Sequence, residues 1–174
     1  MGPCNDQSPS DFEPPSEAPA EVPAGARLNL LLSYGGWREG TAVDQLPHLL
    51  TPLGIHSIRV HSGEEAAEVI SNTSIHIAVV DLAIPLHRRR EEKTPDNPSG
   101  PRVLQLLRRL EEPPPTVVVR PPQAAARESA RTLSDALRAG AFAVLDRPVN
   151  LEIMLEVMRR VLRRHYADHW PRSA

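Results

Sequence analysis

Aromatic residues, cysteine and long apolar runs are all scarce in this sequence. Only 3% of the residues are aromatic, and Cys4 is the one cysteine. A single cysteine excludes an intrachain disulfide framework and any metal site built from several cysteines. No apolar run approaches the roughly 20 residues that cross a bilayer. The first residues lack the basic and apolar regions of a secretory signal, so we expect a cytoplasmic protein outside the membrane.

An excess of charge of one sign is also missing. The 174 residues carry 20 Lys+Arg against 22 Asp+Glu, a formal net charge of −2. A run of three arginines at 88–90 is followed at once by Glu91 and Glu92, which breaks up a basic patch. We therefore expect no nucleic-acid partner and no polybasic contact with a membrane. The length suits one domain with its own core.

Proline, in contrast, is abundant, and its distribution indicates the organisation of the chain. Six of the 19 prolines fall in residues 1–26, a leader with no basic side chain and with five acidic ones, Asp6, Asp11, Glu13, Glu17 and Glu21. Such a segment cannot bury enough apolar surface to offset its ordering entropy, so we predict that it is disordered. The predicted domain covers 27–166, with a flexible insertion at 86–101 and a tail at 167–174.

Five short apolar runs predict β-strands at 28–32, 55–60, 75–80, 116–119 and 142–145. The runs LNLLL, IHIAVV and TVVV are nearly continuous, which is typical of parallel strands that are covered on both faces. The run at 55–60 alternates more between apolar and polar residues. This alternation fits a strand at an edge of the sheet.

Helical periodicity separates these runs. Leucines at 46, 49, 50 and 53 form a stripe that Pro47 and Pro52 restrict to a short or kinked helix. Ser62 and Glu65 form a capping box before a helix at 63–70. Further helices are predicted at 102–110, at 127–139 before Gly140, and from the cap residue Asn150 onward. Strands that alternate with helices predict one open, doubly wound α/β domain.

In such folds, ligands bind at the carboxyl ends of the strands. The polar residues expected at that edge are Ser33, Tyr34, Asp81, Arg120, Asp146 and Arg147, with Pro148 next to the last of them. Asp81 stands out because it comes directly after the apolar run IHIAVV. These residues are the candidate functional site.

Two strings of residues resemble the CheY-like receiver domains of two-component response regulators. VHSGEEAAEVI followed by IHIAVVDLAIP is similar to that family's second helix, third strand and phosphoacceptor aspartate, which corresponds to Asp81. LRAGAFAVLDRPVNLEIMLEVM resembles its last strand and helix, with Arg147 at the place of a lysine and Pro148 after a cis peptide. The resemblance covers nearly all of 27–166 and implies a flavodoxin-like, five-stranded parallel sheet of order 2-1-3-4-5.

The sequence departs from that family at several positions of the site. Two acidic residues that hold magnesium correspond to Ser33 and Tyr34, and a hydroxyl residue that contacts the phosphoryl group corresponds to Arg120. Magnesium normally takes more than one carboxylate from a protein, so Asp81 alone is a poor metal site. A guanidinium matches a carboxylate closely. We therefore hypothesise that Arg147, together with Arg120, pairs with Asp81. The other interpretation of Arg120 is a solvated strand end.

These features predict a stand-alone, degenerate receiver that acts by protein–protein contact in a two-component or phosphorelay pathway. It would be no enzyme, with no catalytic residue, metal or cofactor. The resemblance implies a histidine kinase or a downstream effector as partner, and weak self-association through the last helix.

Two alternatives remain open. The first is a working receiver that uses magnesium and is phosphorylated on Asp81 by a histidine kinase. The second is another flavodoxin-like enzyme or cofactor carrier. The scarcity of aromatic residues to stack a flavin, and the lack of a phosphate-binding glycine motif, argue against the second.

Overall fold

A five-stranded parallel sheet forms the centre of the computed structural model, which describes residues 28–33, 42–87, 98–121 and 126–166. The predicted leader at 1–26, Tyr34 and the tail at 167–174 lie outside these residues. The strands are β1 (Leu28–Ser33), β2 (Ile55–Val60), β3 (Ile77–Asp81), β4 (Thr116–Arg120) and β5 (Ala143–Asp146). Their order is β2-β1-β3-β4-β5. This topology confirms the predicted doubly wound, flavodoxin-like fold.

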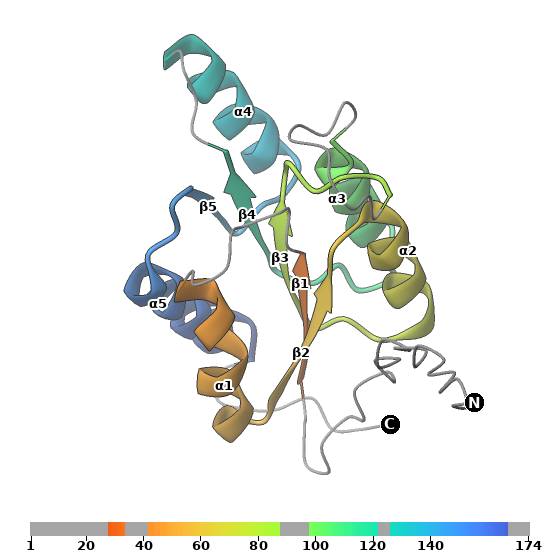
Figure 1. Cartoon of the computed structure of the whole chain (residues 1–174), viewed down its shortest axis with the longest axis vertical. Coiled ribbons are helices and arrows are strands. Elements are labelled where there is room, and N and C mark those ends of the chain that lie inside the picture. Colours follow the sequence, from red (N-terminus) through yellow and green to blue (C-terminus); the bar gives the residue numbers. More distant parts are fainter. Residues whose placement is uncertain (1–27, 34–41, 88–97, 122–125, 167–174) are drawn as a thin grey trace, which may run out of the picture.

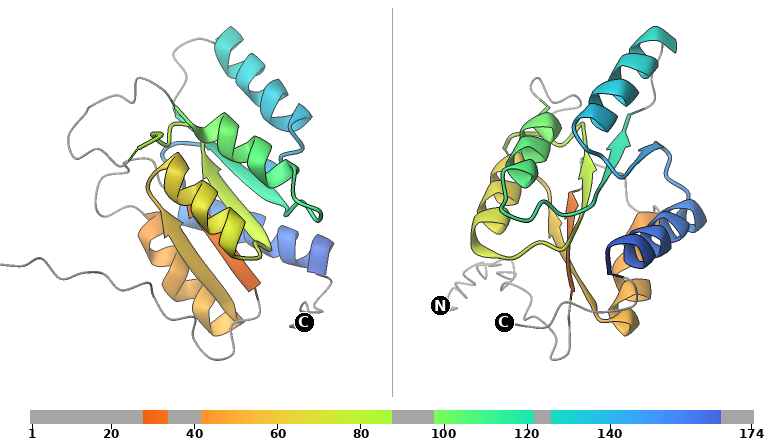
Figure 2. Two further views of the ribbon diagram at one scale, coloured as in Figure 1. Left: turned by 90° about the vertical axis from the view of Figure 1, so that its right-hand side faces the viewer. Right: turned by 180° about the vertical axis from the view of Figure 1, so that it is seen from behind.

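Helices cover both faces of the sheet (Figures 1 and 2). They are α1 (Leu46–Leu50), α2 (Gly63–Asn72), α3 (Gly100–Arg108), α4 (Ala126–Arg138) and α5 (Leu151–Val161), with short η1 (Ala42–Gln45), η2 (Thr51–Leu53) and η3 (Leu162–Tyr166). One buried cluster joins the sheet to α1 and α5, and a second joins it to α2 and α3. The fourth helix, α4, lies beside β5 and extends past the end of the sheet (Figure 1).

Burial of the strands follows the apolar pattern of the sequence. Every residue of β3 and β4 is buried, as expected for strands covered by helices on both faces. The alternating strand β2 lies at an edge, as predicted. Ile75 and His76, predicted to open the third strand, instead precede it, because β3 begins at Ile77.

The first helical region differs from its prediction. Leu46 and Leu50 are buried, whereas Leu49 and Leu53 are about half exposed. Pro47 lies in the first turn of α1, where a missing N–H costs no hydrogen bond, and Pro52 lies in the first turn of η2. The stripe of four leucines therefore does not face the core as one continuous surface.

Polar side chains fix the starts of α2 and α5. The Ser62 hydroxyl accepts a hydrogen bond from the Glu65 backbone N–H at 3.1 Å, as the capping box predicts. The Glu65 carboxylate bonds the N–H of His61 at 2.7 Å, one residue earlier than in the usual box. The Asn150 side chain caps α5 by accepting from the N–H of Glu152 at 2.7 Å. Both predicted caps are confirmed.

The connection between β3 and α3 is anchored at both ends. Pro85 and Pro98 form an isolated antiparallel bridge, and the Gly63 N–H at the start of α2 donates to the Pro85 carbonyl at 2.8 Å. The hydroxyl of Ser99 donates to the carbonyls of Ile84 and Pro85. Since α3 begins at Gly100, the expected insertion at 86–101 is helical in its last residues, and 88–97 lie outside the described residues.

At the opposite, amino-terminal edge of the sheet, His76 joins β1 to the end of α5. Its Nδ1 accepts a hydrogen bond from the Asn29 N–H at 3.0 Å, and its backbone N–H donates to the Asn29 carbonyl at 3.0 Å. The Tyr166 hydroxyl donates to the His76 carbonyl. Burial, with the nearby Glu112 carboxylate, raises the pKa of Tyr166 to about 12. Through His76, Tyr166 at the end of η3 is therefore linked to the start of β1.

The His76 contact predicts a pH-dependent stability. Burial lowers the pKa of His76 below its ordinary 6.5. In addition, its Nδ1 cannot be protonated without losing the hydrogen bond that it accepts. The unfolded chain therefore binds this proton at a higher pH than the folded chain. We expect stability to fall as pH drops below about 6.5, and the fall to end below the lowered pKa of the folded state.

Urea unfolding of wild type and His76→Asn between about pH 5 and 7 measures this effect. The asparagine keeps a side-chain acceptor but cannot be protonated, so its stability should depend less on pH. Some dependence should remain, because burial and Arg164 also lower the pKa of His165. An identical pH dependence in both proteins would contradict the assignment to His76.

Candidate functional site

The predicted site residues meet at the carboxyl-terminal edge of the sheet. Ser33 ends β1, Asp81 ends β3, Arg120 ends β4, and Arg147 directly follows β5. Parallel strands bring these four positions to one edge although up to 114 residues separate them in sequence. Pro148 follows Arg147 through a cis peptide bond, as the resemblance implied. The predicted position Tyr34 lies outside the described residues.

Asp81 is fully buried, with 0% of its side chain exposed. Its backbone N–H donates to the Ser33 hydroxyl at 2.8 Å, and its Oδ1 accepts from the Ala83 N–H at 2.9 Å. A buried carboxylate is costly to keep ionised unless a cation compensates for the lost hydration. The surroundings of Asp81 therefore require a positive charge.

Arg147 supplies that charge. Its Nη2 lies 2.5 Å from each Asp81 carboxylate oxygen, Oδ1 and Oδ2, and 22% of its side chain is exposed. Its backbone N–H donates to the Arg120 carbonyl at 3.0 Å, which fixes the start of the turn after β5. Charge-assisted hydrogen bonds of this kind are stronger than neutral ones. One guanidinium nitrogen thus bridges both oxygens that a phosphoryl group or a metal ion would contact.

Arg120 forms a second ion pair, with Asp146 on the neighbouring strand. Its Nε donates to Asp146 Oδ1, and its Nη2 lies 3.2 Å from Oδ2. The two residues are direct partners in the β4–β5 register, and opposite charges at such positions attract. Arg120 therefore contacts Asp146, a pair that we had not expected, and its predicted pairing with Asp81 stays a prediction.

The interpretation of Arg120 as a solvated strand end is wrong, because only 7% of this residue is exposed. Asp146 was expected at this edge but was given no partner from the sequence. Its position could have indicated this partner, because Asp146 ends β5 directly opposite the end of β4 once the two strands are paired. With Asp146 included, two arginines and two aspartates form the polar edge, and their formal charges cancel.

The donor set does not fit a magnesium ion. Asp81 has both oxygens in contact with Arg147, and the Ser33 hydroxyl already accepts from the Asp81 backbone. Magnesium requires near-octahedral oxygen ligands, usually with one or two free carboxylates. In the described part of the chain, no group of three or more His, Cys, Asp and Glu side chains could hold a metal ion.

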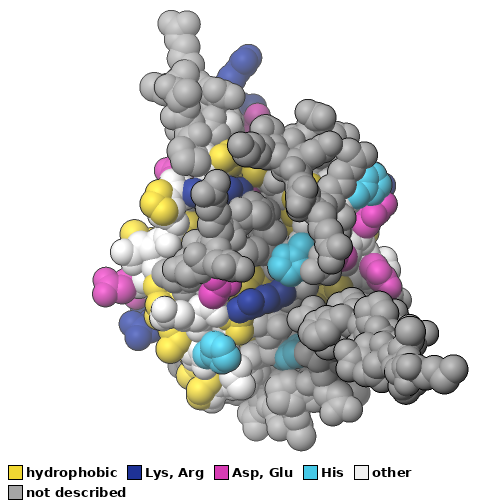
Figure 3. All heavy atoms as spheres, in the orientation of Figure 1, with side chains coloured by type: hydrophobic (Ala, Val, Ile, Leu, Met, Phe, Trp, Pro, Cys, Tyr) yellow, Lys and Arg dark blue, Asp and Glu magenta, His cyan; other side chains and the backbone are white. Residues whose placement is uncertain are grey.

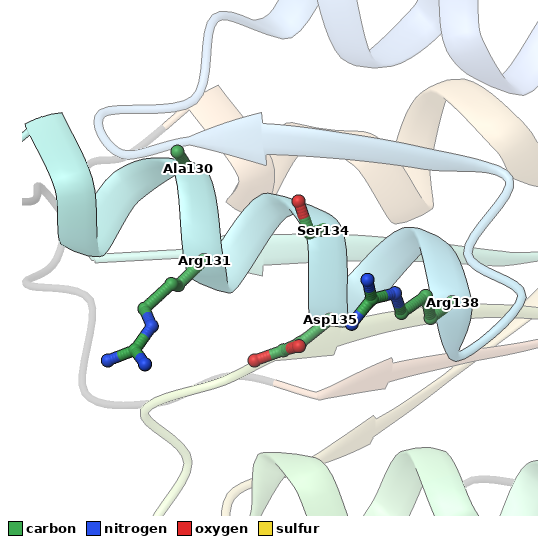
Figure 4. A pocket seen from close by; sticks show the side chains of 5 residues that line it. All are labelled: Ala130, Arg131, Ser134, Asp135 and Arg138. Atoms are coloured by element: carbon green, nitrogen blue, oxygen red, sulfur yellow. The ribbon is translucent and has the colours of Figure 1, made fainter.

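A surface hollow lies on α4 among the described residues. This hollow is shallow and is lined by Ala130, Arg131, Ser134, Asp135 and Arg138 (Figure 4). On the face seen in Figure 3, basic, acidic and apolar side chains are interspersed among the described residues. Among these residues, no helix is long and apolar enough to cross a membrane. Exposed apolar side chains include Leu137 on α4 and Ile153 on α5.

Comparison with known proteins gives structural matches only. Neither the family models nor the curated proteins contain a match. The receiver domain of an HD domain-containing protein from Pseudomonas fluorescens Pf-5 aligns with a TM-score of 0.58 and 14% identity, over 82% of this chain and 99% of that one. The non-phosphorylated HemR receiver domain from Leptospira biflexa aligns with a TM-score of 0.56 and 19% identity, over 84% and 98%.

A CheY-like response-regulator receiver domain from Methanospirillum hungatei JF-1 is also similar. Its TM-score is 0.54 at 21% identity, over 78% of this chain and 93% of that one. The alignments cover nearly the whole of each matched domain, and the strand order agrees with the resemblance noted in the sequence. The chain therefore has the fold of the CheY-like receiver domains of response regulators.

Proposed function

We propose that this chain is a receiver-like signalling module that acts by contact with other proteins and not by phosphorylation of Asp81. The observation that carries the proposal is the Arg147 Nη2 at 2.5 Å from both Asp81 oxygens. An incoming phosphoryl group would have to displace this guanidinium and then meet the carboxylate without a divalent ion. Phosphoryl transfer depends on positioning and charge neutralisation, and the described donors supply neither to the phosphoryl group.

The partners proposed from the receiver fold are a histidine kinase or a downstream effector, in a two-component or phosphorelay pathway. Fold likeness alone carries this part of the proposal. The surfaces offered to such partners are the exposed sides of α4 and α5, where Leu137 is 52% and Ile153 is 54% exposed. Apolar side chains surrounded by charged ones are typical of contact surfaces. Weak self-association through α5 is part of the same proposal.

A phosphotransfer assay tests the proposal. We expect the wild-type chain, incubated with acetyl phosphate and Mg²⁺, to gain no phosphoryl group by intact mass spectrometry. The matched positive control is Ser33→Asp/Tyr34→Asp/Arg147→Lys, which restores two carboxylates and removes the bridging guanidinium. Labelling of this variant alone would assign the defect to the replaced residues.

Magnesium titration followed by NMR provides an independent readout. The Ala83 N–H donates to Asp81 Oδ1, so its amide resonance reports on anything that binds the carboxylate. We expect no saturable shift of this resonance in the wild type. A saturable shift, together with a hydroxylamine-labile adduct on Asp81, would refute the proposal and favour a working receiver.

A further inference from the structure

The end of α5 and the following η3 carry an exposed basic cluster, which the proposed function does not use. The basic cluster consists of Arg159, Arg160, Arg163 and Arg164, all of them exposed. Glu156 pairs with the first two, at 3.9 Å and 3.3 Å. No described acidic side chain pairs with Arg163 or Arg164. Arginines in the last turn also suit the helix dipole, but this leaves their outward-facing donors available.

The start of β1 lies at the same end of the molecule as the basic cluster. The Tyr166 hydroxyl, two residues after Arg164, bonds the His76 carbonyl, and the His76 N–H bonds the Asn29 carbonyl at 3.0 Å. The chain therefore enters the domain beside the end of α5. Because an extended residue spans at most about 3.5 Å, the last acidic residue of the leader, Glu21, lies within about 25 Å of Leu28.

The leader has the opposite charge. Residues 1–26 contain five acidic side chains and no lysine or arginine. Single exposed ion pairs are weak, but a covalent tether gives the leader an effective concentration of about millimolar at the basic cluster. A hollow on the same helix is lined by Ile153, Val157 and Arg160, and also by Glu152 and Glu156.

We propose that the acidic leader docks on the basic cluster of α5 within the same molecule. Docking places the leader over one of the surfaces assigned above to partner contact, so that it competes with partners for α5. The inference rests on the charges and on the position of the β1 start, and it stands whether or not Asp81 is phosphorylated.

Paramagnetic relaxation enhancement tests the docking in the full chain. Cys4 is the one cysteine and lies in the leader, so a nitroxide attached there labels a single known position. We expect the label to broaden amide resonances of Arg159–Tyr166 more than those at the end of α3. The broadening should disappear in about 0.5 M NaCl, where the Debye length falls to about 4 Å.

Two variants and one mixture make the result specific. Neutralising the five leader acids, or Arg163→Gln/Arg164→Gln, should abolish the broadening. The matched control Arg108→Gln/Arg109→Gln changes two exposed arginines at the end of α3 and should leave it intact. Equal broadening at both helix ends, or no effect of the leader variant, would overturn the proposal. Broadening that persists when labelled unenriched protein is mixed with unlabelled ¹⁵N protein would assign the contact to a second copy and overturn it too.

Discussion

Replacing Arg147 with methionine is expected to lower the free energy of unfolding by about 3–5 kcal/mol. Methionine retains much of the apolar stem but removes the cation from Asp81, whose side chain is fully buried. A buried carboxylate without its cation loses hydration and gains nothing in return. Equilibrium urea unfolding at neutral pH, followed by circular dichroism, measures the loss.

The matched control is Arg138→Met, which changes an exposed arginine on α4 and should shift stability by less than about 0.5 kcal/mol. The double variant Asp81→Leu/Arg147→Met removes both charges and should recover much of the loss, because apolar replacements of a buried ion pair are often tolerated. If the single variant lost no more than the control, the ion pair would not be the main compensation for Asp81.

Replacing Gly100 with alanine is expected to cost about 3 kcal/mol, at the upper end of the usual cost of overpacking. An added Cβ would lie 2.4 Å from the Leu82 Cα and 2.6 Å from its carbonyl oxygen. Both are backbone atoms, so the clash cannot be relieved by rotating a side chain. Leu82 directly follows Asp81 and bonds β4 through its N–H at 2.8 Å. Thermal and urea unfolding, with the Ala83 amide shift as a local probe, measure the effect.

Gly140 provides the comparison within the same chain. Its φ of +78° is left-handed, but an added Cβ would meet no atom within 4 Å. Gly140→Ala should therefore cost only about 1 kcal/mol, from backbone conformation alone. If both alanine variants lowered the free energy of unfolding by a similar amount, α3 would be able to move away from Leu82 and relieve the clash.

The strands were predicted well from the sequence because buried strands appear there as short, nearly continuous apolar runs. The apolar runs of β1, β3 and β4 are typical of strands covered on both faces, and their ends fell within two residues of the predictions. His76 marks where this failed. It lies between Ile75 and Ile77 in the predicted strand, yet its ring accepts a hydrogen bond from β1, a tertiary contact that periodicity does not encode.

The members of the site followed from the fold, and the pairing of Arg147 with Asp81 was predicted, but the pairing of Arg120 with Asp146 was not. Once the strands are parallel, Ser33, Asp81, Arg120 and Arg147 must share one edge. Which carboxylate each guanidinium contacts depends on register and side-chain direction. Asp146 is the direct partner of Arg120 across β4 and β5, which favours their ion pair. Arg147 lies one residue beyond β5, so the pairing of β4 with β5 does not fix its side chain, which reaches Asp81.

The contacts that hold the β3–α3 connection were missed entirely. Ser99 reads as an ordinary loop residue, yet it is 5% exposed and bonds two carbonyls. Gly63 reads as the first residue of a capped helix, but a Cβ there would lie 2.2 Å from the Ser99 hydroxyl oxygen. Both requirements arise from segments 36 residues apart in the chain, so no local pattern reveals them.

The bridge between Pro85 and Pro98 joins the two described stretches that flank 88–97. Hydrogen bonds among Gly63, Pro85, Ile84 and Ser99 hold the residues on either side of 88–97 in place. The distance between Pro85 and Pro98 is therefore set by these contacts and not by the length of the segment that joins them. Lengthening a surface connection costs little entropy. A peptide epitope or a small inserted module at 88–97 should thus leave the sheet edge and Asp81 undisturbed.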